Sequence, residues 1–169
     1  MKAAKKAIRL PGKKRAKETR YFFNNARVLA RIAKEREGER KDDVVAVLFR
    51  DADTATAGRG PWPEKRQSML DGFLEEGFAR GVPMIPKPTS EAWLLCALRK
   101  NPYQGCAALE DRSSNPRSPH SLKGELGKRL GHPPTREELC ELVANGRIDH
   151  RSIDMPSFNA FRERLEAVL

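Results

Sequence analysis

Two aspartates one residue apart, Asp51 and Asp53, follow the most apolar stretch of the sequence, VVAVLF (44–49). Side chains two residues apart on an extended chain point the same way, so these two carboxylates would converge. Converging carboxylates repel each other unless a cation lies between them, and Mg²⁺ and Mn²⁺ prefer oxygen ligands of this kind. The spacing therefore predicts a divalent-cation site, with an ordinary polar turn before Gly58 and Gly60 as the alternative.

A third acid, Glu91, follows the next apolar stretch, VPMIP (82–86), in the segment KPTSEAW. If 44–49 and 82–86 are neighbouring parallel strands, their carboxyl ends meet at one edge of the sheet, where ligands collect in α/β proteins. Glu91 then comes within reach of the aspartate pair. The alternative for Glu91 is structural, because an acid near a helix N-terminus is favoured by the macrodipole alone. We therefore predict Asp51, Asp53 and Glu91 as catalytic residues and as ligands of Mg²⁺ or Mn²⁺.

Four basic side chains border the same region and could contact a phosphate group of a substrate. Arg50 precedes the aspartate pair, Lys65 follows the loop after it, and Lys87 follows the second apolar stretch. Lys123 lies further along, in the segment SPHSLKGEL (118–126). We predict these four residues as substrate-binding groups, with simple solvation at the surface as the alternative for each.

The residues between the two apolar stretches predict the element that positions these groups. VVAVLF is continuous rather than alternating, which is typical of a strand covered on both faces. Pro63 suits the first turn of a helix, apolar residues recur at helical spacing from Met69 to Phe78, and Gly81 ends the pattern. Strand, helix and strand make a βαβ unit with parallel strands.

Helical patterns flank this unit on both sides. Before it, an apolar stripe with a basic opposite face predicts a helix over 14–36. After it, Ser90 predicts the N-cap of a helix over 91–99, and Thr135 with Glu138 forms the pattern of a capping box. Further short helices are predicted over 107–110, 121–130, 135–144 and 156–168.

The whole pattern predicts an α/β fold, namely a small Rossmann-like parallel sheet flanked by helices, with a helical C-terminal part. We divide the chain into a basic helical N-terminal arm (1–41), a βαβ core (42–100) and a loop-rich helical part (101–169). Two strands alone make a poor sheet, so a further strand or a partner element is expected.

The net charge of +10 is concentrated in the first 41 residues, which hold 15 basic and 4 acidic side chains. The remaining 128 residues have a net charge of −1. Such a basic arm would attract a polyanion through counterion release, so nucleic acid is the expected partner. The alternative is a solvated basic helix that binds nothing specific.

Other features bear on the class of protein. No run of eighteen apolar residues is present, so no membrane-spanning segment is expected, and the basic N-terminus lacks the apolar core of a secretory signal. The three cysteines, Cys96, Cys106 and Cys140, are scattered and odd in number. This usage predicts no disulfide framework and a cytoplasmic location.

The stretch VVAVLFRDADTA, an amphipathic helix and then VPMIPKPTSEAWLLCAL together resemble the TOPRIM superfamily, in particular small bacterial proteins related to OLD-type nucleases. The resemblance covers about residues 42–100. It implies a Rossmann-like domain that binds Mg²⁺ or Mn²⁺ for phosphodiester chemistry on DNA or RNA, with Asp51 and Asp53 as the Asp-x-Asp ligands and Glu91 as the acid after the following strand. Some members of that group accompany phage-defence ATPases, so an ATPase partner is a further expectation.

Domains of that superfamily begin with a strand that ends in a Glu-Gly motif, and no such strand stands before residue 42. Two functions therefore stay open. One is a metal-dependent nuclease acting in phage defence or mobile-element biology, and the other is a non-catalytic binding or partner module. A third reading is a phosphotransfer enzyme of the haloacid-dehalogenase type, because DADTA is similar to Asp-x-Asp-x-Thr/Val, although Ala55 departs from that pattern.

Overall fold

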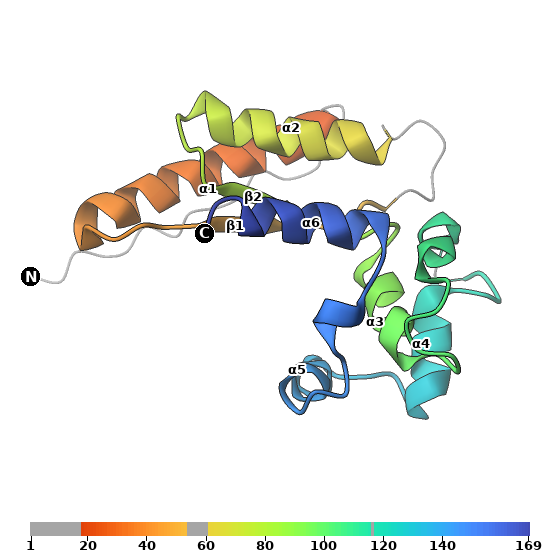
Figure 1. Cartoon of the computed structure of the whole chain (residues 1–169). Helices are drawn as coiled ribbons and strands as arrows, with labels where there is room; N and C mark the ends of the chain where they lie inside the picture. Colours follow the sequence, from red (N-terminus) through yellow and green to blue (C-terminus); the bar gives the residue numbers. More distant parts are fainter. Residues whose placement is uncertain (1–17, 54–60, 116) are drawn as a thin grey trace, which may run out of the picture.

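The computed structural model of the chain describes residues 18–53, 61–115 and 117–169, which form a mixed α/β structure made mostly of helices. The elements follow in the order α1 (Glu18–Arg40), β1 (Ala46–Phe49), α2 (Trp62–Glu75), β2 (Gly81–Met84), α3 (Ser90–Leu98), η1 (Cys106–Asp111), α4 (Leu122–Leu130), α5 (Arg136–Ala144), η2 (His150–Ser152) and α6 (Pro156–Glu166). In Figure 1, α1 and α2 lie side by side along the sheet, and α3, α4 and α5 gather at one end of it. Among the described helices, none combines the length and the apolar character needed to cross a membrane.

The predicted βαβ unit is confirmed. Strands β1 and β2 pair in parallel, with Ala46 opposite Gly81 and Phe49 opposite Met84, and α2 connects them. The pairing continues past the strand ends, since the Ala52 N–H donates to the Pro86 carbonyl at 2.9 Å. In the described ranges no strand pairs with the other edge of β1, so the sheet has two strands there.

Helices α1 and α2 build a core against one face of the sheet. The predicted apolar stripe of α1 is confirmed, because Phe22, Ala26 and Ala33 are buried. The two helices cross closely at Gly72, where an added Cβ would lie 2.3 Å from the Phe23 carbonyl oxygen. The helix of the predicted N-terminal arm is therefore part of the core, while residues 1–17 of that arm lie outside the described residues.

An ion-pair cluster at the end of α2 fixes the two helices further. The Glu76 carboxylate accepts hydrogen bonds from Arg27 at 2.7 Å and from Arg31 at 2.7 and 2.9 Å. These contacts, led by the hydrogen bonds from Arg31, lower the pKa of Glu76 to about 2. Part of the basic charge of α1 is thus neutralised by an acid of the same chain.

A second core lies on the opposite face, where α6 packs against β2 and against α3. The Trp93 ring meets Phe158 edge-on with 4.9 Å between centroids, and its indole nitrogen donates to the Ser157 hydroxyl at 2.8 Å. This face covers β2 but not β1, because Val47 and Phe49 remain 42% and 52% exposed. The prediction that 44–49 is covered on both faces is therefore wrong for β1.

The prediction that the cysteines form no disulfide is also wrong. Cys96 and Cys106 form a disulfide with their Cα atoms 5.2 Å apart, while Cys140 is free and exposed. The chain turns back after α3, and the Tyr103 N–H donates to the Cys96 carbonyl at 2.7 Å. That turn brings the start of η1 back to α3, which a reading of cysteine spacing alone does not reveal.

Most helix ends agree with the sequence patterns, with one exception at α3. The capping box of Thr135 and Glu138 is confirmed, and the Ser121 hydroxyl caps α4 by accepting from the Gly124 N–H. Ser90 is not the N-cap of α3, since that position belongs to Thr89, whose side chain makes no capping bond. The Ser90 N–H is instead capped by Asp51, at 2.7 Å, from the end of β1.

Candidate functional site

The predicted acids Asp51 and Asp53 lie together at the carboxyl end of β1. They line a hollow of about 470 Å³, which we call the acidic hollow, with Phe49, Arg50 and Thr89. The chain turns sharply here, because Asp53 has φ 51, a left-handed conformation that favours glycine but that aspartate tolerates better than most residues. The loop with Gly58 and Gly60, on which the polar-turn alternative rests, lies outside the described residues.

Asp51 is half-buried, and its surroundings disfavour the ionised carboxylate. Burial raises its pKa, and the negative charges of Glu91 and Asp53 raise it further, while hydrogen bonds from Ser90 lower it. The ionised form of Asp51 is therefore less stable at this position than in solvent. A cation beside it would remove that penalty.

Glu91 lies in the first turn of α3, one residue beyond Ser90. It does not line the acidic hollow but a neighbouring pocket, although it is close enough to Asp51 to affect the pKa of that residue. Across the described part of the chain, no three acidic, histidine or cysteine side chains come together closely enough to hold a metal ion. Any cation here would thus be held by the two aspartates and other ligands.

The predicted basic residues are placed in four different ways. The Arg50 guanidinium stacks on the Tyr21 ring at 4.2 Å beside the two aspartates, whereas Lys65 is fully buried and its ammonium donates to the Ala52 carbonyl. Lys87 pairs with Asp111 at 3.2 Å, and Lys123 lies away from the acidic hollow. Arg50 is therefore the predicted cation that borders the acids, while Lys65 supports the backbone beneath them.

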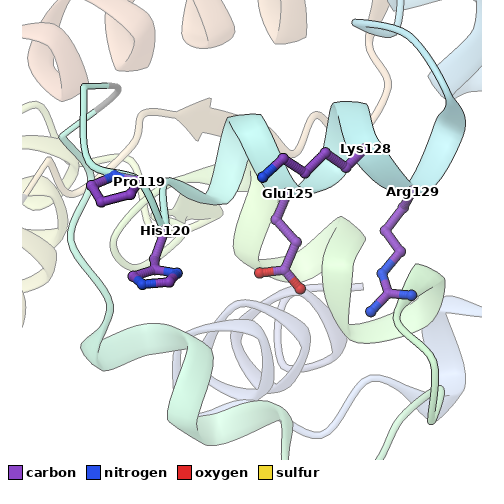
Figure 2. A pocket seen from close by; sticks show the side chains of 5 residues that line it. All are labelled: Pro119, His120, Glu125, Lys128 and Arg129. Atoms are coloured by element: carbon purple, nitrogen blue, oxygen red, sulfur yellow. The ribbon is translucent and has the colours of Figure 1, made fainter.

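The neighbouring pocket is larger, at about 700 Å³, and lies between α3, α4 and the start of α5. We call it the basic pocket, because its lining includes Lys123, Lys128, Arg136 and His132 against one carboxylate, Glu91. A smaller hollow of about 300 Å³ lies between α4 and the preceding loop (Figure 2). Lys128 lines both, so α4 presents basic side chains to two cavities.

The two main cavities meet at the start of α3. Thr89 lines the acidic hollow, and Ser90 and Glu91 line the basic pocket. The hydrogen bond from the Ser90 N–H to Asp51 joins them directly. Of the residues that line this pocket, the sequence analysis predicts Glu91 and Lys123 but not the others, whose one visible signal was the recurrence of glycine at 124, 127 and 131.

Comparison of the chain with protein families, with curated proteins and with solved structures finds no match. The function must therefore be argued from the geometry of the two cavities.

Proposed function

We propose that Asp51 and Asp53 hold a divalent cation with which the chain acts on phosphodiester groups of nucleic acid. The observation that carries this proposal is the placement of both carboxylates in one hollow at the carboxyl end of a parallel strand, beside Arg50. Ligands collect at this end of the strands in α/β proteins. The net charge of +10 favours a polyanionic substrate.

The donor set fits Mg²⁺ or Mn²⁺. Magnesium usually keeps several waters and takes one or two carboxylates together with phosphate oxygens, so two aspartates suffice. Asp51 and Asp53 would hold the ion, and Glu91 would add negative charge from the neighbouring pocket. When bound, the cation would supply an activated water and stabilise negative charge on the phosphate. Arg50 would orient that phosphate through its guanidinium, which stacking on Tyr21 holds in place.

A TOPRIM-like Rossmann domain is the fold that we propose around this site. Its support is the chain order of strand, Asp-x-Asp, helix, parallel strand and then Glu91 at the start of a helix. The proposal predicts that the described two-stranded sheet is the part of a larger sheet that carries the acids.

Thermal unfolding of the full chain with and without Mn²⁺ tests the cation site. Mn²⁺ at a hundredfold excess over its Kd should stabilise the folded state by about 2.7 kcal/mol, because a ligand that binds only the folded state shifts unfolding by mass action. Asp53→Ala should abolish this shift. Asp42→Ala, an exposed aspartate that precedes the same strand, is the matched control and should keep it.

Nuclease assays on DNA and RNA then separate two functions. Mn²⁺-dependent cleavage that Asp53→Ala removes supports the enzyme. A non-catalytic binding module is the second candidate, favoured by the position of Glu91 in a cavity other than the acidic hollow. Mn²⁺-dependent stabilisation with nucleic-acid binding but no cleavage would select that module, and no Mn²⁺ effect on the wild type would contradict both forms of the proposal.

A further inference from the structure

The basic pocket has the size and the mixed lining of a ligand site. Its volume of about 700 Å³ lies inside the usual range for small-molecule pockets, roughly 300–1,000 Å³. Leu94 and Leu139, both partly exposed, give it an apolar surface, and the cations stand around that surface. A free inorganic anion would use the cations but not the leucines, so the lining favours a ligand with both an apolar and an anionic part.

Of the four basic side chains of the pocket, only His132 lies beside an acid, Glu138, at 3.5 Å. Within the described ranges, Lys123, Lys128 and Arg136 have no ion pair, although Arg27 and Arg31 pair with Glu76 and Arg80 pairs with Glu37. The positive charge at the pocket is therefore left for an external partner.

Two of these cations also stand where a helix does not favour them. Lys123 lies in the first turn of α4 and Arg136 is the first residue of α5. A helix N-terminus carries partial positive charge, so a cation there costs stability rather than adding it. The fold itself gains nothing electrostatically from either side chain, and both add to the positive potential of the helix ends that line the pocket.

Helix α4 also presents glycines to the pocket. Gly124 and Gly131 have structural reasons to be glycine, since a Cβ at Gly124 would lie 2.7 Å from the Ser121 hydroxyl and Gly131 has φ 84. Gly127 has neither reason, because a Cβ there would meet the His132 carbonyl oxygen at an ordinary 3.6 Å. A glycine inside a helix costs about 1 kcal/mol relative to alanine, and here it keeps the pocket open.

We infer that the basic pocket binds one unpaired nucleotide of a single-stranded nucleic acid, with the base against the leucines and the adjacent phosphates on Lys123, Lys128 and Arg136. This inference rests on the proposed function, and it names an unpaired strand as the substrate class. A base inside a duplex has both faces stacked, so only an unstacked base can use an apolar lining. The strand would continue past Ser90 to the acidic hollow, which the Ser90–Asp51 hydrogen bond joins to the pocket.

Fluorescence anisotropy of a labelled single-stranded hexanucleotide, titrated with the full chain in EDTA, tests the pocket without the cation. Gly127→Leu places a side chain in the pocket and should weaken binding about tenfold, the scale of one lost base contact. Gly127→Ala is the matched control, because it adds only a methyl group, and it should bind within about twofold of the wild type. A duplex of equal length should bind about tenfold more weakly than the single strand.

A second pair of variants tests the charges without touching the helix packing. Lys123→Ala with Arg136→Ala should reduce the magnitude of the slope of log K against log salt by about 1.4, since each phosphate contact on a single strand contributes about 0.7. Arg147→Ala, an exposed cation that is absent from the pocket lining, should reduce it less. Equal binding by Gly127→Leu and Gly127→Ala, or an unchanged slope in the double variant, would overturn the inference. Since Asp51 and Asp53 are not needed in EDTA, failure of the cation site leaves this test intact.

Discussion

Replacing Asp51 in two ways separates its structural role from its electrostatic one. The Asp51 carboxylate accepts a hydrogen bond from the Ser90 N–H at 2.7 Å, and so caps α3 from the end of β1. Asp51→Ala removes the acceptor, and the loss of such a cap costs about 1 kcal/mol. For a chain of 169 residues that corresponds to a fall in Tm of about 2–4 °C.

Asp51→Asn keeps an oxygen for the Ser90 N–H but removes the charge. The pKa of Asp51 is raised in the folded state, first by burial and then by Glu91 and Asp53. For a carboxyl group whose folded pKa is raised, stability is greatest below the unfolded pKa and falls as the pH rises through the folded pKa. At pH 7 in EDTA, Asp51→Asn should therefore be at least as stable as the wild type.

Thermal unfolding followed by circular dichroism, at pH 7 and at pH 3.5, measures both effects. The Tm difference between Asp51→Asn and the wild type should shrink at pH 3.5, just below the ordinary pKa of 3.8, where the wild-type carboxyl is mostly protonated in both states. If Asp51→Asn is as unstable as Asp51→Ala at pH 7, the ionised carboxylate stabilises the fold. That result would refute the claim that the Asp51 charge destabilises the folded chain when no cation is bound.

Three further predictions concern the fold. Because the pKa of Glu76 is lowered to about 2, its contribution to stability is present above about pH 4.5 and is lost as the pH falls toward 2. The free energy of unfolding of Glu76→Gln should therefore depend less on pH between these two values than that of the wild type. Reduction of the Cys96–Cys106 disulfide should cost about 2–3 kcal/mol in urea unfolding, and Cys106→Ser should make the chain insensitive to reductant. Gly72→Ala should destabilise the chain by about 1–3 kcal/mol in the same assay, because its Cβ would overlap the Phe23 carbonyl. Gly38→Ala is the control, since its Cβ would enter open space and should stabilise the helix. Equal effects of the two variants on stability would contradict the close crossing of α1 and α2.

The parts of the fold that the sequence predicted well are those encoded by local patterns. The β1–α2–β2 unit follows from two short apolar stretches and a helical stripe, and the capping box at Thr135 follows from side chains within three residues of the groups they bind. These features depend on neighbours in the chain, so periodicity and capping rules suffice to find them.

The features that escaped prediction depend on contacts between distant segments. Asp51 caps a helix 39 residues further along the chain, and Cys96 meets Cys106 only because the turn at Tyr103 reverses the chain. Lys65 was predicted as a substrate-binding group, with solvation as the alternative, but its long side chain is buried and donates to the Ala52 carbonyl. Nothing in the residue types alone distinguishes such a lysine from a solvated one.

The same limit applies to the candidate site. The aspartate pair could be predicted because both side chains follow one strand, whereas the position of Glu91 depends on how α3 leaves β2. Glu91 lines the basic pocket, which the starts of α3 and α5 form together with the length of α4. No spacing rule links Lys123 with Arg136 across the turn between α4 and α5.

Electron paramagnetic resonance of free Mn²⁺, titrated against the full chain, tests the central claim most directly. The wild type should remove Mn²⁺ from solution at a saturable site, Asp51→Asn combined with Asp53→Asn should not, and Asp42→Asn should. Equal Mn²⁺ binding by the wild type and the double variant, or none by either, would contradict a divalent-cation site at the end of β1.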